Sequence, residues 1–176
     1  MSICTRPLPL RLLAGCSLFA AAMAPLAAMD NLGADSSAPR LGGELLFGTS
    51  GFEPGIDAAW RFHTMSSTMI IRPELLLSED SRPGVALSVS WNLDMLNLPK
   101  NQTLSVGPRI AWHNSDDHGL EGGLMGLYSF DFMNDRPGHH FLEVIGIAGL
   151  VEDKSNDNDK ATRFGGTIGV GYSYQF

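Results

Sequence analysis

FGGTIGVGYSYQF, residues 164–176, alternates strictly between two kinds of residue. One set is mostly large and apolar or aromatic: Phe164, Gly166, Ile168, Val170, Tyr172, Tyr174 and Phe176. The residues between them are small or polar: Gly165, Thr167, Gly169, Gly171, Ser173 and Gln175. Successive side chains of a β-strand point to opposite faces. The stretch therefore predicts a strand with one face against an apolar environment and the other against a polar or crowded one.

The same two-residue period recurs upstream, most clearly in residues 56–63, 85–95, 103–114 and 120–132. Turn-rich pieces divide the chain after residue 40 into eight such segments. We place these turns at residues 51–55, 63–67, 78–84, 97–101, 114–119, 134–138 and 152–162. After residue 28 there is no run of about 20 apolar residues of the kind a spanning helix needs. The chain is therefore predicted to be all-β.

The amino-acid composition excludes some classes of protein. The chain has 176 residues, of which 44% are hydrophobic and 18% charged, so a long disordered protein is excluded. The formal net charge of −7 provides no electrostatic footprint for nucleic acid. We expect no nucleic-acid partner, no cofactor and no bound metal.

Residues 1–28 predict a cleaved export signal. Arg6 and Arg11 precede an apolar stretch, residues 12–27, and small residues precede Met29. Cleavage there removes both cysteines of the chain. We expect residues 29–40 to form a short N-terminal periplasmic segment and residues 41–176 to form the folded domain.

A second interpretation of the leader is open, because Leu13-Ala14-Gly15-Cys16 resembles the site at which bacterial lipoproteins are cut and acylated. Arg11 argues against it. Only four residues separate Arg11 from Cys16, and the apolar run continues beyond the cysteine.

Two architectures produce this alternation: a soluble barrel or sandwich with its apolar face inward, and a membrane barrel with its apolar face outward. The polar face is rich in Gly, Ser, Thr and Ala, which suits the crowded lumen of a small barrel. Large aromatic residues gather near strand ends, and the chain terminates on Phe176. These features favour the membrane barrel.

The end of the chain resembles the carboxy-terminal signal of bacterial outer-membrane barrels: a glycine, an aromatic three positions on, and a terminal phenylalanine. These are Gly171, Tyr174 and Phe176. With the export signal and eight strands, the chain resembles the small eight-stranded outer-membrane proteins, the class of the OmpA membrane domain and OmpX. The resemblance implies an eight-stranded antiparallel up-and-down transmembrane β-barrel in the outer membrane of a Gram-negative bacterium. It implies contact with membrane lipid and lipopolysaccharide, and with the barrel-assembly machinery through the last strand.

In such a barrel both termini are periplasmic, so the inner ends of the even-numbered strands should carry an aromatic girdle. The residues predicted for it on the lipid-facing parity, beside the terminal motif, are Trp60, Phe62, Tyr128, Phe130, Phe132 and Tyr172. A sparser belt at the outer ends would consist of Phe47, Trp112 and Phe164.

The same parity predicts a charged lumen. Its members would be Arg61, Arg72 and Arg109 with Glu44, Asp57, Glu74, Asp94, Glu121, Asp131 and Glu143. A buried charge is expensive unless it is paired, so we expect these side chains to plug the lumen with salt bridges. Arg109 should lie near Glu121, and Arg72 near Asp57 or Asp94. The alternative is a narrow channel.

Three patterns could carry chemistry. His113 and Ser115 have the spacing found in outer-membrane lipid A deacylases, with Glu121 as the nearest acidic partner, although Ser115 begins a loop. Residues 153–159 alternate oxygen ligands like a calcium loop but lack its glycine and its glutamate. His113 and His118 with Asp116 and Asp117 could bind a transition metal. We interpret all three as features of surface loops, and His139 and His140 as solvent-exposed.

The prediction is therefore an outer-membrane β-barrel with a structural, envelope-stabilising or surface-interaction role and an unidentified surface ligand. A lipid A-modifying hydrolase using His113 and Ser115 is the first alternative.

Overall fold

The computed structural model describes residues 35–36, 39–63, 67–78, 82–114, 118–133, 138–153 and 161–176. The expected export signal, residues 1–28, lies outside these ranges. Within them, no helix is long and apolar enough to cross a membrane.

Eight long strands account for most of the described chain, and each runs antiparallel to the next. They are β2 (Arg40–Gly48), β3 (Gly51–His63), β4 (Thr68–Leu77), β5 (Pro83–Asn92), β6 (Gln102–Trp112), β7 (His118–Asp131), β8 (His139–Asp153) and β9 (Ala161–Gln175). A two-residue strand, β1 (Asp35–Ser36), pairs with the end of β3. One 3-10 turn, η2 (Asp94–Leu96), lies between β5 and β6.

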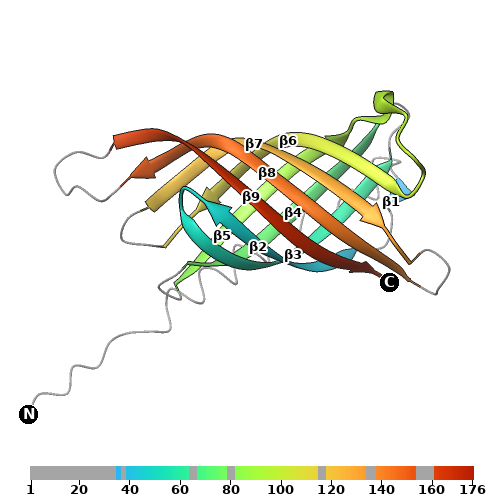
Figure 1. Ribbon diagram of the computed structural model, residues 1–176, viewed down its shortest axis with the longest axis horizontal. Helices are drawn as coiled ribbons and strands as arrows, with labels where there is room; N and C mark the ends of the chain where they lie inside the picture. Colours follow the sequence, from blue (N-terminus) through green and yellow to red (C-terminus); the bar gives the residue numbers. More distant parts are fainter. Residues whose placement is uncertain are drawn as a thin grey trace, which may run out of the picture.

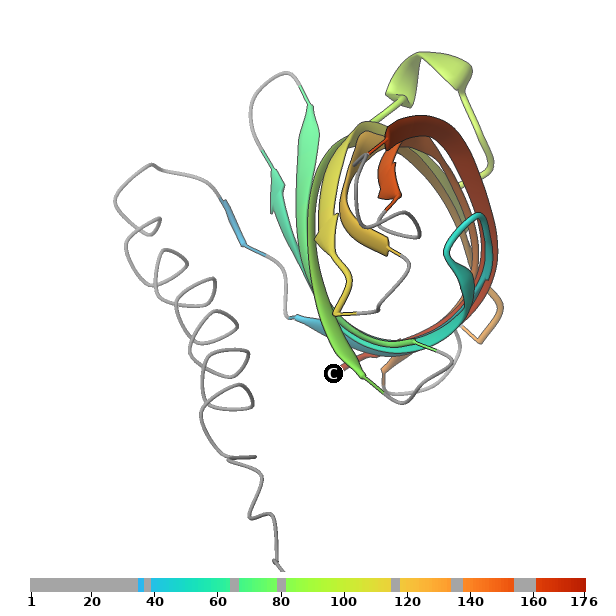
Figure 2. The ribbon, with the colours of Figure 1, turned by 90° about the vertical axis from the view of Figure 1, so that its left-hand side faces the viewer.

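The sheet closes on itself through its first and last long strands. β2 pairs with β9 from Arg40 opposite Gln175 to Gly48 opposite Thr167, and every other pair of neighbouring long strands is consecutive in the chain. The predicted all-β fold, an eight-stranded antiparallel up-and-down barrel, is confirmed. Figure 1 shows the strands crossing the long axis obliquely, and Figure 2 shows the closed ring end-on.

The barrel has two rims, the C-terminal rim and the distal rim. The C-terminal rim holds the end of β9 and the β3–β4, β5–β6 and β7–β8 connections, and it lies at the right of Figure 1. The distal rim holds the other four connections.

The first predicted turn is wrong. Residues 51–55 belong to β3, and the chain reverses at Thr49 and Ser50 instead. Glycine and proline in this stretch indicate a turn, but Pro54 pairs with Leu45 of β2. β4 pairs with β3 only from Gly55 onward, so Pro54 lies at an edge of the sheet, where a missing N–H is tolerated. Two further boundaries shift: β2 begins at Arg40, and β5 ends at Asn92.

Burial alternates along the strands as the sequence predicts. The interior, however, contains apolar side chains as well as the predicted charged ones. Toward the middle and distal part of the barrel, inward-facing apolar side chains form one cluster: Leu46, Leu76, Ala86, Ala111, Met125, Leu127, Ile145 and Ile147. Small residues also occur where the backbone of a neighbouring strand comes very close. A side chain at Gly107 would begin 2.0 Å from the carbonyl oxygen of Val89. Apolar and charged groups thus fill the interior together.

Candidate functional site: the charged interior

Arg72 on β4 is the centre of the charged interior. Its guanidinium lies 2.9 Å from Glu44, 3.1 Å from Asp57, 3.2 Å from Glu143 and 4.0 Å from Glu74. All five side chains are almost completely buried. Because an unpaired charge in such a place is strongly unfavourable, the side chains depend on one another for stability.

Arg109 on β6 extends the cluster toward the distal rim. Its Nε and Nη2 donate to Oε2 of Glu74 at 3.0 and 2.8 Å, and its Nη1 donates to Oε1 of Glu121 at 3.1 Å. Glu74 therefore faces both buried arginines, and Glu121 carries the network onward.

His113 follows the end of β6, beyond Trp112, and is only 1% exposed. Its Nδ1 donates to Glu53 at 2.7 Å and its Nε2 donates to Glu121 at 3.1 Å. A carboxylate only accepts hydrogen bonds, so holding both contacts requires a proton on each ring nitrogen. Burial by itself lowers the pKa of His113, but the two glutamates outweigh it and raise the pKa to about 9. His113 is therefore an imidazolium at neutral pH.

The chain of contacts also continues toward the C-terminal rim. Arg40 Nη1 lies 3.6 Å from Glu143, and its guanidinium stacks on the ring of Phe141 at 3.2 Å. Arg61 donates to the hydroxyl of Thr103 at 3.2 Å. Charged groups thus follow the interior from His113 near one rim to Arg61 near the other.

The structure brings together most of the lumen residues predicted from sequence. Arg109 lies beside Glu121, and Arg72 lies beside Asp57. Asp131 faces inward but pairs with His139 at 2.7 Å. His139 is half exposed, whereas His140 is partly buried and contacts the hydroxyl of Tyr172 at 2.6 Å.

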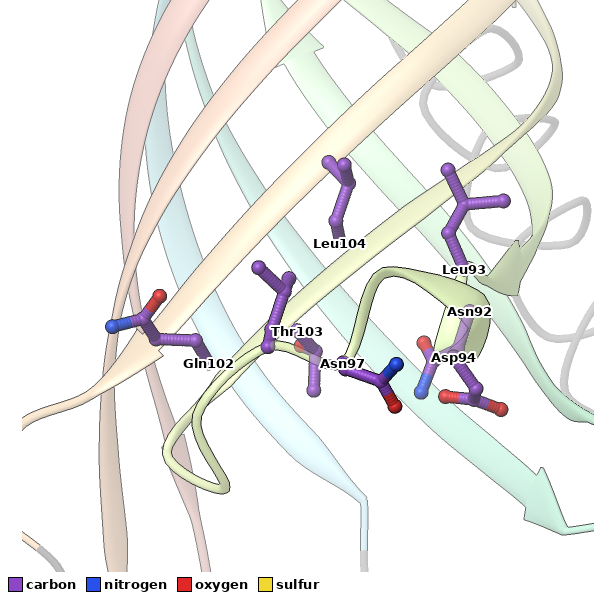
Figure 3. Close-up of a pocket in the computed structure, with 8 residues that line it drawn as sticks. Asn92, Leu93, Asp94, Asn97, Gln102, Thr103 and Leu104 are labelled. Atoms are coloured by element: carbon purple, nitrogen blue, oxygen red, sulfur yellow. The ribbon is translucent and has the colours of Figure 1, made fainter.

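The placement of Asp94 in the lumen is wrong. β5 ends two residues earlier, and Asp94 begins η2 on the exposed β5–β6 connection. Figure 3 shows it beside Asn92 at a surface recess of about 180 Å³. Beyond the end of a strand the two-residue alternation no longer determines which way a side chain points.

Sequence reasoning missed three members of the network: Arg40, Glu53 and His113. The sequence-based prediction has Arg40 in the segment before the barrel and Glu53 in a turn. Both share the parity of inward residues on their strands, Glu44 and Asp57, and extending β2 and β3 would have found them. His113 shares the polar-face parity of Arg109 in the predicted segment 103–114, but the sequence-based prediction leaves it out of the lumen network and interprets it with the loop patterns.

The predicted aromatic girdle is only partly on the outer surface. Phe132 and Tyr172 are exposed near the C-terminal rim, and Trp60, Tyr128 and Phe130 are half-buried. Phe62 shares the outward parity of Trp60 but is only 3% exposed, so it contributes almost nothing to the outer surface. It is buried where β1 joins the edge of β3, with Ser36 opposite it. At the distal end, Phe47, Trp112 and Phe164 are all exposed.

The terminal motif makes specific contacts. Gly171 pairs with both Glu44 and Glu143, and a side chain there would lie 3.6 Å from Glu143. Tyr174 covers Gly138, whose φ of +89° and proximity to the tyrosine hydroxyl both exclude a larger residue. Phe176 packs edge-on against Tyr174 with ring centroids 4.9 Å apart.

The chemical alternatives receive little geometric support. Glu121 does contact His113, but both ring nitrogens face glutamates, which leaves neither nitrogen for a serine hydroxyl. Ser115, Asp116, Asp117 and the part of the candidate calcium loop after Asp153 lie outside the described residues. His118 contacts Arg163 at 2.9 Å.

The chain matches no protein-family model and no curated protein. The role of the barrel must therefore be argued from its geometry.

Proposed function

We propose that this chain is an integral outer-membrane β-barrel of a Gram-negative bacterium, exported by residues 1–28, with a structural or envelope-stabilising role. Its distal loops would offer a surface for interaction. Lipid and lipopolysaccharide would surround the barrel, and the assembly machinery would recognise the last strand.

The observation that carries this proposal is the apolar outer surface. Every long strand exposes a large apolar side chain to the outside, for example Leu45, Ile56, Leu77, Trp91, Ile110, Leu124, Val144 and Ile168. Soluble monomers rarely expose continuous apolar patches larger than a few hundred Å². A closed barrel satisfies its backbone hydrogen bonds between its own strands, which hydrocarbon requires.

The interior supports a structural role over conduction. Four carboxylates surround Arg72, and the apolar cluster fills neighbouring space. An eight-stranded barrel has room for little more than its side chains. A lumen filled in this way opposes steady ion flow.

Three measurements test the proposal: cell fractionation, gel migration and conductance. The mature protein should fractionate with outer membranes, and it should migrate differently in detergent gels before and after boiling. In planar bilayers the purified protein should show no steady conductance. Recovery in the soluble periplasm with identical migration would contradict the membrane assignment, and a steady current would favour the channel. Altered lipid A acylation on expression would favour the hydrolase.

A further inference from the structure

A recess opens into the barrel interior at the C-terminal rim. It has a volume of about 220 Å³ and is bordered by Arg40, Arg61, Lys100, Thr103 and Asp131, among others. Since a water molecule occupies about 30 Å³ in the liquid, this space corresponds to about seven waters. It is large enough for a small polyatomic ion.

Arg61 on β3 distinguishes this recess from the rest of the interior. Arg40, Arg72 and Arg109 each have a carboxylate within 4 Å. Within the described ranges Arg61 has none: its contacts are the hydroxyl of Thr103 at 3.2 Å and the ring of Phe141 at 5.8 Å. A guanidinium has five N–H donors, and only one is used by Thr103.

The other charges at the recess leave it net positive. Arg40 is partly neutralised by Glu143, which it shares with Arg72. Asp131 is engaged by His139 at 2.7 Å and also accepts from the backbone of Met133. Lys100 lies exposed on the turn before β6 and adds a flexible ammonium at the opening.

From these contacts we infer that the recess binds a phosphate group, with Arg61 as the main ligand and Lys100 and Thr103 as supporting donors. A guanidinium can contact two phosphate oxygens at once, and the ammonium adds charge without a fixed geometry. The same group could arrive as free inorganic phosphate or as the headgroup of an anionic phospholipid at the rim. The recess belongs to the barrel itself, so this inference does not depend on the proposed membrane location.

The site can be tested on the mature protein folded in maltoside micelles, which contain no phosphate. Titration with inorganic phosphate should shift the backbone amide resonances of Thr103 and Ser129 saturably, and leave those of Gly165 and Val151 at the distal end unchanged. Arg61→Gln should weaken binding at least about tenfold. The matched control is Arg163→Gln, which removes the same charge at the exposed distal rim and should leave binding unchanged.

Two further arms complete the test. Lys100→Gln, on an exposed turn, should weaken binding several-fold even if Arg61→Gln does not fold. Short-chain phosphatidylglycerol added instead of phosphate distinguishes the sources, because the same amides should shift if the headgroup enters. The inference is overturned if neither probe shifts these amides, or if the folded Arg61→Gln and Lys100→Gln variants both bind as the natural protein does.

Discussion

Arg109 and Glu121 lie diagonally opposite each other on the inner face of β6 and β7, and Arg109 Nη1 donates to Glu121 Oε1 at 3.1 Å. Each of the two residues also has a second charged partner. Arg109 also binds Glu74, and Glu121 also binds His113. The pair is therefore one connection in a longer network, and this determines how substitutions should behave.

Reversing either charge, by Arg109→Glu or Glu121→Arg, should destabilise the barrel by at least about 3–5 kcal/mol, because each leaves buried charges unpaired and adds like-charge repulsion. The double reversal should recover only a minor part of the loss. It places a glutamate beside Glu74 and an arginine beside His113, so new repulsions replace the old attraction. Urea unfolding in detergent micelles measures these free energies. As a control, Arg163→Glu disturbs an exposed pair with Asp153 and should cost less than about 1 kcal/mol. Full recovery in the double variant would mean that the pair is independent of the network.

Two glycines test the difference between the inner and outer faces. Gly171→Val should destabilise by roughly 1–3 kcal/mol, because its side chain would meet the carbonyl of Gly43 at 3.3 Å and crowd Glu143. Gly146→Val should be close to neutral, since a Cβ at this position has no atom within 4 Å and lies in open space. Both changes add the same atoms to a strand. Equal effects on the urea midpoint would contradict the assigned faces.

His113 should make stability depend on pH in a defined direction. Its pKa is about 9 in the folded protein and 6.5 ordinarily, so the folded state holds the proton more tightly. The resulting stabilisation, at most about 3 kcal/mol, is complete below pH 6.5 and disappears as pH rises through 9. The stability difference between the natural protein and His113→Gln should therefore shrink between pH 6.5 and 9. Unfolding measured at several pH values checks this, and a difference that stays constant would show that His113 does not titrate in this range.

The terminal residues should differ in their importance for assembly. Phe176 is 71% exposed on the outer surface, whereas Gln175 turns toward the interior and accepts from Arg40 at 3.4 Å. Phe176→Ser should lower insertion into membranes much more than Gln175→Ser, because the former removes the terminal aromatic of the predicted assembly signal. Quantifying heat-modifiable protein in outer-membrane fractions compares them. Equal yields would contradict the role given to Phe176.

The amino-acid sequence by itself was sufficient to predict the eight strands and the parity of most side chains. The reason is that a two-residue period is a local property, visible wherever a strand has two different environments. It placed Arg72, Glu74, Arg109 and Glu121 inside. It failed where local signals conflicted with pairing, as in β3, whose glycine and proline residues indicate a turn.

Which inward-facing side chains contact one another is determined only by the closed barrel. His113 and Glu53 are 60 positions apart. Glu53 lies on β3 and His113 directly follows β6, and these two strands are not neighbours in the sheet, so the contact crosses the lumen. Glu74 is on the same strand as Arg72, but the other three carboxylates come from β2, β3 and β8, and only register and ring closure bring them to Arg72. Parity specifies a face, but the distance across a barrel depends on strand tilt and on how neighbouring side chains fill the space.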